Sequence, residues 1–200
     1  MNVNQIQKIG IIGAGQMGNG IAQVCAAQKL EVLIYDISQT SLEKGLVTIS
    51  SSLDRLIKKA TMTEDDKKAI LGQIKVTTQI SDLKNSDFVI EAATENIDLK
   101  LKIFKELDAV VKPEAILATN TSSISITKIA AATMRPSQVV GMHFMNPVPL
   151  MKLVEGIKGL QTSPETFTLT KQLSEKLGKV FVESVKDMPG FIVNRVLMPM

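Results

Sequence analysis

Aromatic residues are scarce in this sequence. It has no tryptophan and one tyrosine, and aromatic residues make up 4% of its 200 residues. No dense stripe of lysine and arginine is present either, and the formal net charge is only +3. We therefore expect no nucleic-acid partner, whereas this mildly basic balance is compatible with an anionic small-molecule ligand.

Cysteine and long apolar runs are also scarce. Cys25 is the single cysteine and stands between Val24 and Ala26, which indicates a buried, inert thiol. It cannot form an internal disulfide, so we expect a reducing compartment and a cytoplasmic protein. The first residues, MNVNQIQK, lack the basic and apolar regions of a signal peptide. No apolar run approaches the length of a membrane span, so we expect no membrane segment.

Short β-branched runs alternate with helical patterns along the chain. The first five runs are continuously apolar, which is typical of strands covered on both faces of a parallel sheet. The alternation predicts an α/β fold with a Rossmann-like doubly wound sheet. The expected strands are Lys8–Ile12, Glu31–Asp36, Asp87–Ala92, Ala115–Asn120, Val139–Phe144, Lys152–Gly156 and Lys179–Ser184.

About forty residues after the second strand depart from this alternation and have helical character. We expect one long helix over Ser38–Ala60 and a second that begins with Thr63 as its N-cap, the two forming a projecting hairpin. A domain boundary is expected near Asp187, which divides the chain into a ligand-binding domain over 1–186 and the start of a truncated helical domain over 187–200. Phe191–Met200 is expected to be an apolar helix.

Three glycines form the pattern Gly13-x-Gly15-x-x-Gly18 between the first strand and a helix. Gly13 permits the tight turn, Gly15 lets a pyrophosphate approach the backbone, and Gly18 allows close packing of helix on strand. Asp36 ends the second strand, where a carboxylate accepts hydrogen bonds from the adenine ribose and repels a 2′-phosphate. The pattern predicts NAD as cofactor rather than NADP, the alternative being a glycine-rich turn without a ligand. Gly20 is not required by it, and we expect it to relieve crowding against the sheet.

His143 is the only histidine, and it falls near the end of a predicted strand, where open α/β sheets bind their ligands. Glu155 lies twelve residues later within an apolar run, where an unpaired carboxylate is costly to bury. If the two segments form a hairpin, Glu155 accepts a hydrogen bond from one ring nitrogen and raises the basicity of the other. The alternatives are a histidine without chemistry and a solvated carboxylate at the sheet edge.

Polar residues also cluster where the strand before Thr121 gives way to a loop. Asn120, Ser122 and their neighbours are suited to holding a carbonyl oxygen or the nicotinamide ribose, although a helix cap or a turn explains them equally well. Asn194 stands in the apolar segment near the end of the chain, where it either faces the site or lies on the surface.

Together these motifs resemble the L-3-hydroxyacyl-CoA dehydrogenase family. The resemblance covers the whole chain and is carried by the glycine pattern, by Asp36, and by EAATEN (91–96), ATNTSSISIT (118–127), GMHFMNPVPLMKLVE (141–155) and PGFIVNR (189–195). It implies that His143 is the catalytic base, that Glu155 is its partner, and that Ser122 and Asn194 contact the reacting oxygen and the nicotinamide.

The resemblance also implies two sets of binding residues. The residues implied to contact NAD, besides the three glycines and Asp36, are Gln16, Met17, Ala92, Ala93, Glu95, Lys100, Asn120, Ser122 and Asn146. The residues of the helical hairpin implied to contact the CoA part of the substrate are Ser51, Arg55, Lys58 and Lys59. For the hairpin residues, a solvated helix face is an equally good explanation.

The implied reaction is hydride transfer between NAD(H) and an L-3-hydroxyacyl-CoA, most simply the pair 3-hydroxybutyryl-CoA and acetoacetyl-CoA. The family's longer chains carry a further helical domain that builds a homodimer and closes the acyl site. A chain that ends at Met200 is therefore expected to bind NAD but to turn over acyl-CoA poorly, as a monomer or a non-native associate. The alternatives are a non-catalytic, crystallin-like relative and another β-hydroxyacid dehydrogenase of similar fold.

Overall fold

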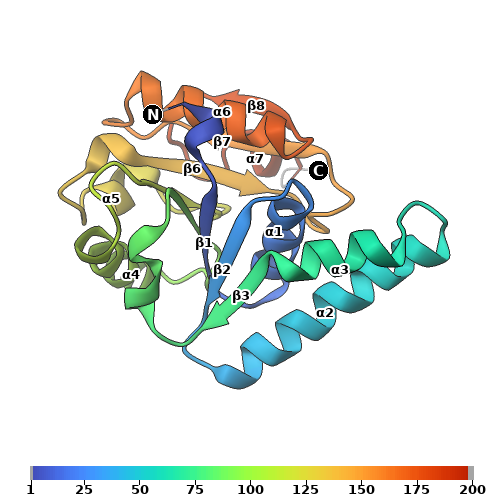
Figure 1. Cartoon of the computed structure of the whole chain (residues 1–200). Helices are drawn as coiled ribbons and strands as arrows, with labels where there is room; N and C mark the ends of the chain where they lie inside the picture. The colour runs from blue at the N-terminus through green and yellow to red at the C-terminus, as the bar shows by residue number, and fades with distance from the viewer. Residues whose placement is uncertain (1, 198–200) are drawn as a thin grey trace.

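In the computed structural model, residues 2–197 are described, and their eight strands form one sheet in the order β3-β2-β1-β4-β5-β6-β7-β8 (Figure 1). Neighbouring strands are parallel except β7, which runs antiparallel to β6 and parallel to β8. The predicted doubly wound fold is confirmed. The strands are β1 Lys8–Ile12, β2 Glu31–Tyr35, β3 Ile74–Thr77, β4 Phe88–Glu91, β5 Ile116–Thr119, β6 Val139–Phe144, β7 Leu153–Ile157 and β8 Val180–Ser184.

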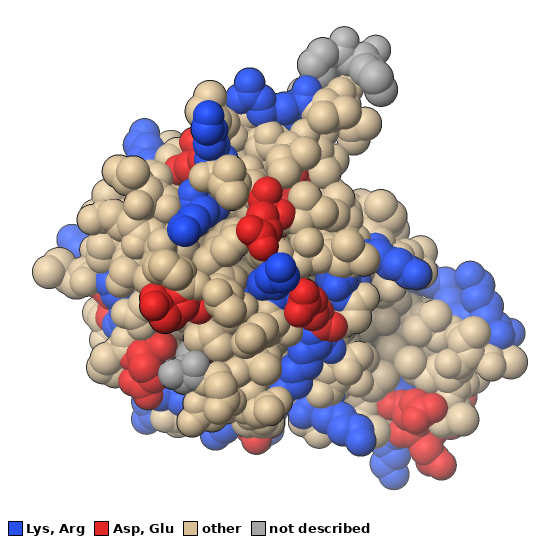
Figure 2. All heavy atoms as spheres, turned by 90° about the horizontal axis from the view of Figure 1, so that it is seen from above, with Lys and Arg blue, Asp and Glu red and all other residues tan. Residues whose placement is uncertain are grey.

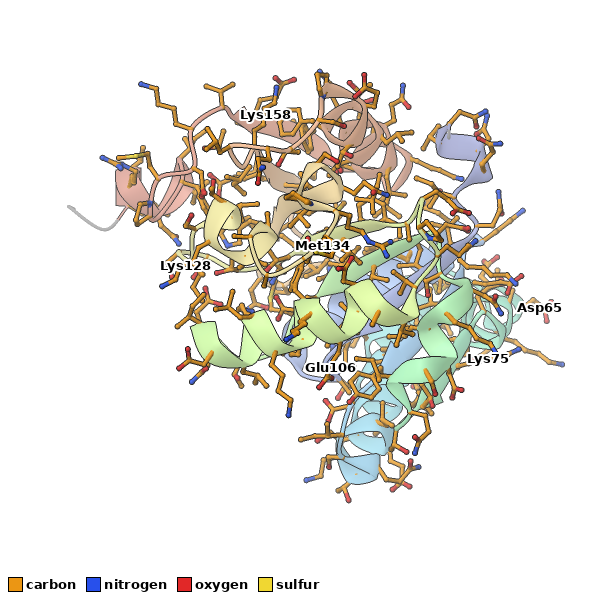
Figure 3. The ribbon with its side chains drawn as sticks, turned by 90° about the vertical axis from the view of Figure 1, so that its left-hand side faces the viewer. Asp65, Lys75, Glu106, Lys128, Met134 and Lys158 are labelled. Atoms are coloured by element: carbon orange, nitrogen blue, oxygen red, sulfur yellow. The ribbon has the colours of Figure 1, made fainter. Side chains whose placement is uncertain are left out.

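Helices cover both faces of the sheet. Side chains of α1, α2 and α6 pack in a core on one face, and those of α4 and α5 pack in a core on the other. Figure 3 is seen from the side of α4 and α5, with Glu106 on α4 and Lys128 on α5. The helices are α1 Gln16–Ala27, α2 Gln39–Lys58, α3 Glu64–Gly72, α4 Ile97–Val110, α5 Ile126–Ala130, α6 Pro164–Lys176 and α7 Val193–Leu197, with short 3₁₀ turns η1 Val3–Gln5, η2 Ile80–Asn85 and η3 Pro136–Gln138.

The predicted helical hairpin is confirmed: α2 and α3 lie side by side and project from the sheet (Figure 1). The hydroxyl of Thr63 accepts a hydrogen bond from the amide of Asp66, whose carboxylate accepts one from the amide of Thr63 in return. This reciprocal cap fixes the start of α3. On α2, Leu42, Ile49 and Leu53 are buried along one face, so the opposite face remains exposed.

The segment after β8 is held closely to the rest of the domain. The carboxylate of Asp187 accepts hydrogen bonds from the hydroxyl of Ser125 at 2.6 Å and from the amides of Ile126 and Thr127 at 2.9 and 2.7 Å. Burial raises the pKa of Asp187, but these hydrogen bonds to its charged form outweigh burial and lower it overall. The expected apolar helix over Phe191–Met200 is present as α7 but begins two residues later, because Phe191 has a left-handed φ of +49°, and positions 198–200 lie outside the described residues. The domain boundary at residue 186 stays a prediction.

Two further expectations from the sequence concern burial and the membrane. Cys25 is fully buried, as expected, and burial raises the pKa of its thiol to about 12. Over residues 2–197, none of the helices combines the length and the apolar character that a membrane crossing requires.

Candidate active site

The glycine loop has the geometry that its sequence predicts. Gly13 has a φ of +97°, and a Cβ there would lie 2.9 Å from the carbonyl oxygen of Ala92, so both conformation and space require glycine. A Cβ on Gly18 would lie 1.9 Å from the carbonyl oxygen of Gly13. A Cβ on Gly15 would meet nothing within 4 Å, so the backbone is open on the side where a pyrophosphate would lie. The loop therefore fits a dinucleotide phosphate.

Asp36 lies directly beside this loop, just after β2. Its Oδ2 accepts a hydrogen bond from the amide of Ala14 at 2.8 Å, and its Oδ1 accepts one from the amide of Ser38 at 2.9 Å. An ionised carboxylate has about four acceptor positions, so two remain for ribose hydroxyls. The structure thus places a negative charge next to the phosphate-binding loop, as an NAD site requires.

Gly20 does not relieve crowding against the sheet, and that expectation was wrong. A Cβ on Gly20 would lie 2.8 Å from the Cβ of Val148, which belongs to the connection between β6 and β7. Glycine therefore lets α1 approach this connection closely. The physical reason is that α1 is covered on its far side by the connection, which no local sequence pattern reveals.

His143 and Glu155 face each other across the antiparallel pair β6 and β7, in direct register. The Nδ1 atom of His143 lies 2.7 Å from Oε2 of Glu155. Glu155 has no exposed surface, and His143 is 7% exposed. The predicted hairpin and the predicted contact between the two side chains are both confirmed.

The other oxygen of Glu155 is occupied by the chain leading into α7. Oε1 accepts hydrogen bonds from the amides of Ile192 and Val193 at 2.9 and 2.8 Å. Burial raises the pKa of Glu155, but the hydrogen bonds from His143 and these two amides outweigh burial and lower the pKa overall. Glu155 is therefore a carboxylate at neutral pH. Nδ1 of His143 must then carry a proton, and a neutral imidazole presents Nε2 as its basic atom.

The start of α7 and the residue Phe191 before it close one side of this pair. The ring of Phe191 packs edge-on against the His143 ring, with 5.9 Å between the centroids. Asn194, half-buried, donates a hydrogen bond from its amide nitrogen to the carbonyl oxygen of Ser122 at 3.3 Å. Asn194 is thus brought next to the polar loop after β5, and not onto a remote surface.

Glu95 accepts hydrogen bonds from the polar residues of that loop. Its Oε1 accepts hydrogen bonds from the Thr121 hydroxyl at 2.5 Å, the Ser122 amide at 2.7 Å and the Ser122 hydroxyl at 3.0 Å. Burial raises the pKa of Glu95, but these hydrogen bonds and the charge of Lys100 lower it overall. Asn120 points the other way, and its Oδ1 accepts from the amide of Phe144 on β6. The polar cluster after β5 thus contacts Glu95, which follows β4, and Phe144 at the end of β6, so it links the carboxyl ends of three strands.

Lys100 lies beneath Glu95 and is 1% exposed. Its Nζ donates to Oε1 of Glu91 at 2.6 Å and lies 3.5 Å from Oε2 of Glu95. Glu91, fully buried, also accepts from the hydroxyl of Thr119 at 2.7 Å and the amide of Ala93 at 2.8 Å. Glu91 was not predicted as a site residue from the sequence. An isolated carboxylate in the apolar run FVIEAA gives the same signal that identified Glu155.

A cavity of about 360 Å³ lies between α1, α2 and the connection from β6 to β7. Among the residues predicted to bind ligands, Gln16, Arg55, Lys59 and Asn146 line it, whereas Ser51 and Lys58 do not. Lysine and arginine side chains gather at the outer end of the hairpin, near the end of α2 (Figure 2). A larger cavity of about 440 Å³ lies at the opposite edge of the sheet, beside Lys8, Glu31 and Lys75, and contains none of the predicted site residues.

Comparison with known proteins identifies the family. Residues 8–188 match the 3-hydroxyacyl-CoA dehydrogenase, NAD binding domain family. The chain belongs to this family. It carries the family's NAD-binding domain, so NAD is the cofactor that its glycine loop fits.

The similar proteins are longer than this chain. It is 51% identical over 195 residues to a 3-hydroxybutyryl-CoA dehydrogenase of Bradyrhizobium diazoefficiens, covering 98% of this chain and 66% of the relative. The crystal structure of an (S)-3-hydroxybutyryl-CoA dehydrogenase from Ralstonia eutropha superposes with a TM-score of 0.95 at 56% identity, covering 98% of this chain and 69% of that one. The chain thus spans about two thirds of the length of these relatives.

Proposed function

We propose that this chain supplies the cofactor site and the proton-transfer residues of an NAD-dependent 3-hydroxyacyl-CoA dehydrogenase acting on 3-hydroxybutyryl-CoA and acetoacetyl-CoA. The observation that carries the proposal is the 2.7 Å contact between His143 and Glu155 in a sheet that also holds the dinucleotide loop. Two relatives of the chain carry this activity in their names. The alternative of a non-catalytic relative does not account for a buried histidine–carboxylate pair whose basic nitrogen is left available for a substrate.

The protein's own residues handle the proton. In the oxidation direction, the 3-hydroxyl of the substrate donates its proton to Nε2 of His143, and the O–H electron pair forms the new carbonyl as hydride leaves C3. Glu155 holds the Nδ1 proton and stabilises the imidazolium that results. In the reduction direction, the imidazolium returns the proton to the developing alkoxide. Bound in the glycine loop, NAD supplies the acceptor or donor of the hydride.

Other residues orient and bind the substrate. Ser122 and Asn194 are linked to each other and lie on the loop and helix that flank His143, which suits contacts to the reacting oxygen and the nicotinamide. Arg55 and Lys59 line the cavity beside Asn146, where two cations favour the phosphates of CoA. Asp36 disfavours a 2′-phosphate, so NADH is expected to bind more tightly than NADPH.

The proposal is tested by His143→Ala. General acid–base catalysis contributes about 10²–10⁴-fold, so turnover of acetoacetyl-CoA with NADH should fall by that factor. The dissociation constant for NADH, measured by fluorescence titration, should stay unchanged because His143 does not line the glycine loop. Binding of acetoacetyl-CoA is measured beside turnover, because the relatives are longer than this chain. Equal turnover by the variant, or failure of the unaltered chain to bind either ligand, would contradict the proposal.

A further inference from the structure

Lys179 is a buried cation outside the residues already assigned. It stands directly before β8 and is 8% exposed. Its Nζ donates hydrogen bonds to the carbonyl oxygen of Val148 at 2.6 Å and to that of Met151 at 2.8 Å. Burial lowers the pKa of Lys179, while the nearby Cys25 raises it. Burying an ammonium group costs free energy unless it is hydrogen-bonded, so the two main-chain oxygens that bind Nζ of Lys179 indicate a specific role for this residue.

The two carbonyl groups belong to the connection between β6 and β7, residues 145–152, and so lie between His143 and Glu155 in the chain. The connection folds as a turn, in which the amides of Leu150 and Met151 both donate to the carbonyl oxygen of Pro147 at 3.0 Å. Lys179 therefore holds the carbonyl groups of Val148 and Met151 in this turn, which begins at Pro147. Charge-assisted hydrogen bonds are stronger than neutral ones, which favours a single arrangement of this turn.

The same turn forms one wall of the cavity proposed to receive the substrate. Val148, Pro149 and Leu150 line the cavity, and Arg55 and Lys59 line it from α2. Val148 also packs against α1, where only glycine at position 20 leaves room for it. The wall is thus held on one side by close contact with α1 and on the other side by Lys179.

From this arrangement we propose that Lys179 is a positioning residue for acyl-CoA, which sets the wall of the substrate cavity by holding the turn between the two strands that carry His143 and Glu155. The inference rests on the proposed function for the identity of the ligand. Lys179 contacts neither the glycine loop nor Asp36, so its loss should change cofactor binding much less than acyl-CoA binding.

The test compares Lys179→Met, which keeps the length of the side chain but removes the ammonium, with Lys171→Met. Lys171 is a matched control because it links α6 to β8 through an exposed ion pair with Glu183 at 3.2 Å. Loss of the charge-assisted hydrogen bonds should raise KM and the dissociation constant for acetoacetyl-CoA about tenfold. The values of kcat and KM for NADH should change by less than about twofold, a split that indicates lost substrate binding only. Lys171→Met should change none of them.

Amide hydrogen exchange provides an independent readout. In Lys179→Met the amides of Leu150 and Met151 should exchange faster than in the unaltered protein, whereas in Lys171→Met they should not. A lowered melting temperature with unchanged KM and unchanged exchange would show that Lys179 only stabilises the fold and would overturn the inference. If the unaltered protein does not bind acetoacetyl-CoA, the proposed function fails. The exchange rates then still decide whether Lys179 holds the turn.

Discussion

A parallel strand in the middle of this sheet and the antiparallel strand β7 each bury one glutamate, and the two glutamates have different partners. Glu91 at the end of β4 and Glu155 in β7 both have no exposed surface, and each accepts hydrogen bonds from one cationic or ionisable side chain and from main-chain or hydroxyl groups. The partner of Glu91 is Lys100, which is itself buried. The partner of Glu155 is His143, which keeps one edge toward the site.

We infer that this difference distinguishes a structural ion pair from the proposed proton-transfer pair. Lys100 and Glu91 are both buried and bind each other, so the β4 pair is suited to holding the loop after β4 that carries Glu95. A neutral imidazole offers one N–H and one basic nitrogen, so the pair of His143 and Glu155 suits the proton transfer that we propose. We therefore infer that the pair at β4 holds structure in place, whereas the pair on β6 and β7 transfers a proton.

The largest effect is expected from breaking the structural pair with Lys100→Met. This change leaves Glu91 buried without its cation, which costs about 3–5 kcal/mol of unfolding free energy. Urea denaturation measures the loss. Lys102→Met is the control, because Lys102 lies 3.9 Å from Glu106 on an exposed face of α4, where an ion pair contributes about 0.3–0.5 kcal/mol.

The double variant Glu91→Gln with Lys100→Met sharpens this test. It keeps a hydrogen-bond acceptor for Thr119 and removes both charges, so most of the lost stability should return. If Lys100→Met alone costs no more than the control, the β4 pair is not a structural ion pair of the kind described, and the contrast with His143 and Glu155 fails.

A smaller effect on stability, but a large one on chemistry, is expected from Glu155→Gln. The amide keeps the shape of the side chain but cannot accept from His143 and from the amides of Ile192 and Val193 without presenting its NH₂ group to a donor. If the NH₂ group donates to Nδ1 of His143, the neutral imidazole carries its proton on Nε2. The nitrogen that faces the substrate is then no longer basic. Because a general base contributes about 10²–10⁴-fold, turnover should fall by about a hundredfold or more, with NADH binding unchanged.

The dependence of stability on pH gives the second readout for Glu155→Gln. The folded pKa of Glu155 is lower than its unfolded value of about 4.3, so its contribution to stability is present above that value and is lost as pH falls through the folded pKa. Asp87, Glu95 and Asp187 also have lowered pKa values and add to the same acid limb. The variant should therefore show a shallower loss of stability in acid. An identical acid limb in both proteins would refute the assignment.

Features that depend on neighbouring residues were predicted from the sequence, whereas features that depend on residues far apart in the chain were not. Seven of the strands and the hairpin follow from period and capping, which are properties of neighbouring residues. The segment IKVT was missed as a strand because Lys75 interrupts its apolar run and only one residue separates it from α3. Its strand conformation comes from pairing with β2, which lies about forty residues earlier.

The same reasoning applies to the candidate site. His143 and Glu155 were predicted because a lone carboxylate among apolar residues needs a partner, and a short connection brings the two strands together. Lys179 could not be predicted, because its acceptors are main-chain oxygens, which carry no residue identity. Glu95 and Lys100 were named only through the family resemblance, and the structure adds that Lys100 is held inside by Glu91.

The smallest effect is expected at the cavity lined by α1, α2 and the connection from β6 to β7. Thr48, Ser52, Arg55 and Lys59 follow one stripe of this helix and line the cavity, whereas Lys58 lies round the helix from that stripe. Arg55→Ala should therefore raise KM for acetoacetyl-CoA about three- to tenfold and reduce its dependence on salt, because one exposed, charge-assisted contact is lost. Lys58→Ala, which removes the same charge from the same turn, is the matched control and should have little effect in steady-state assays. Equal effects of the two variants would indicate a diffuse positive field around the hairpin, and no effect of Arg55→Ala would indicate a solvated helix face.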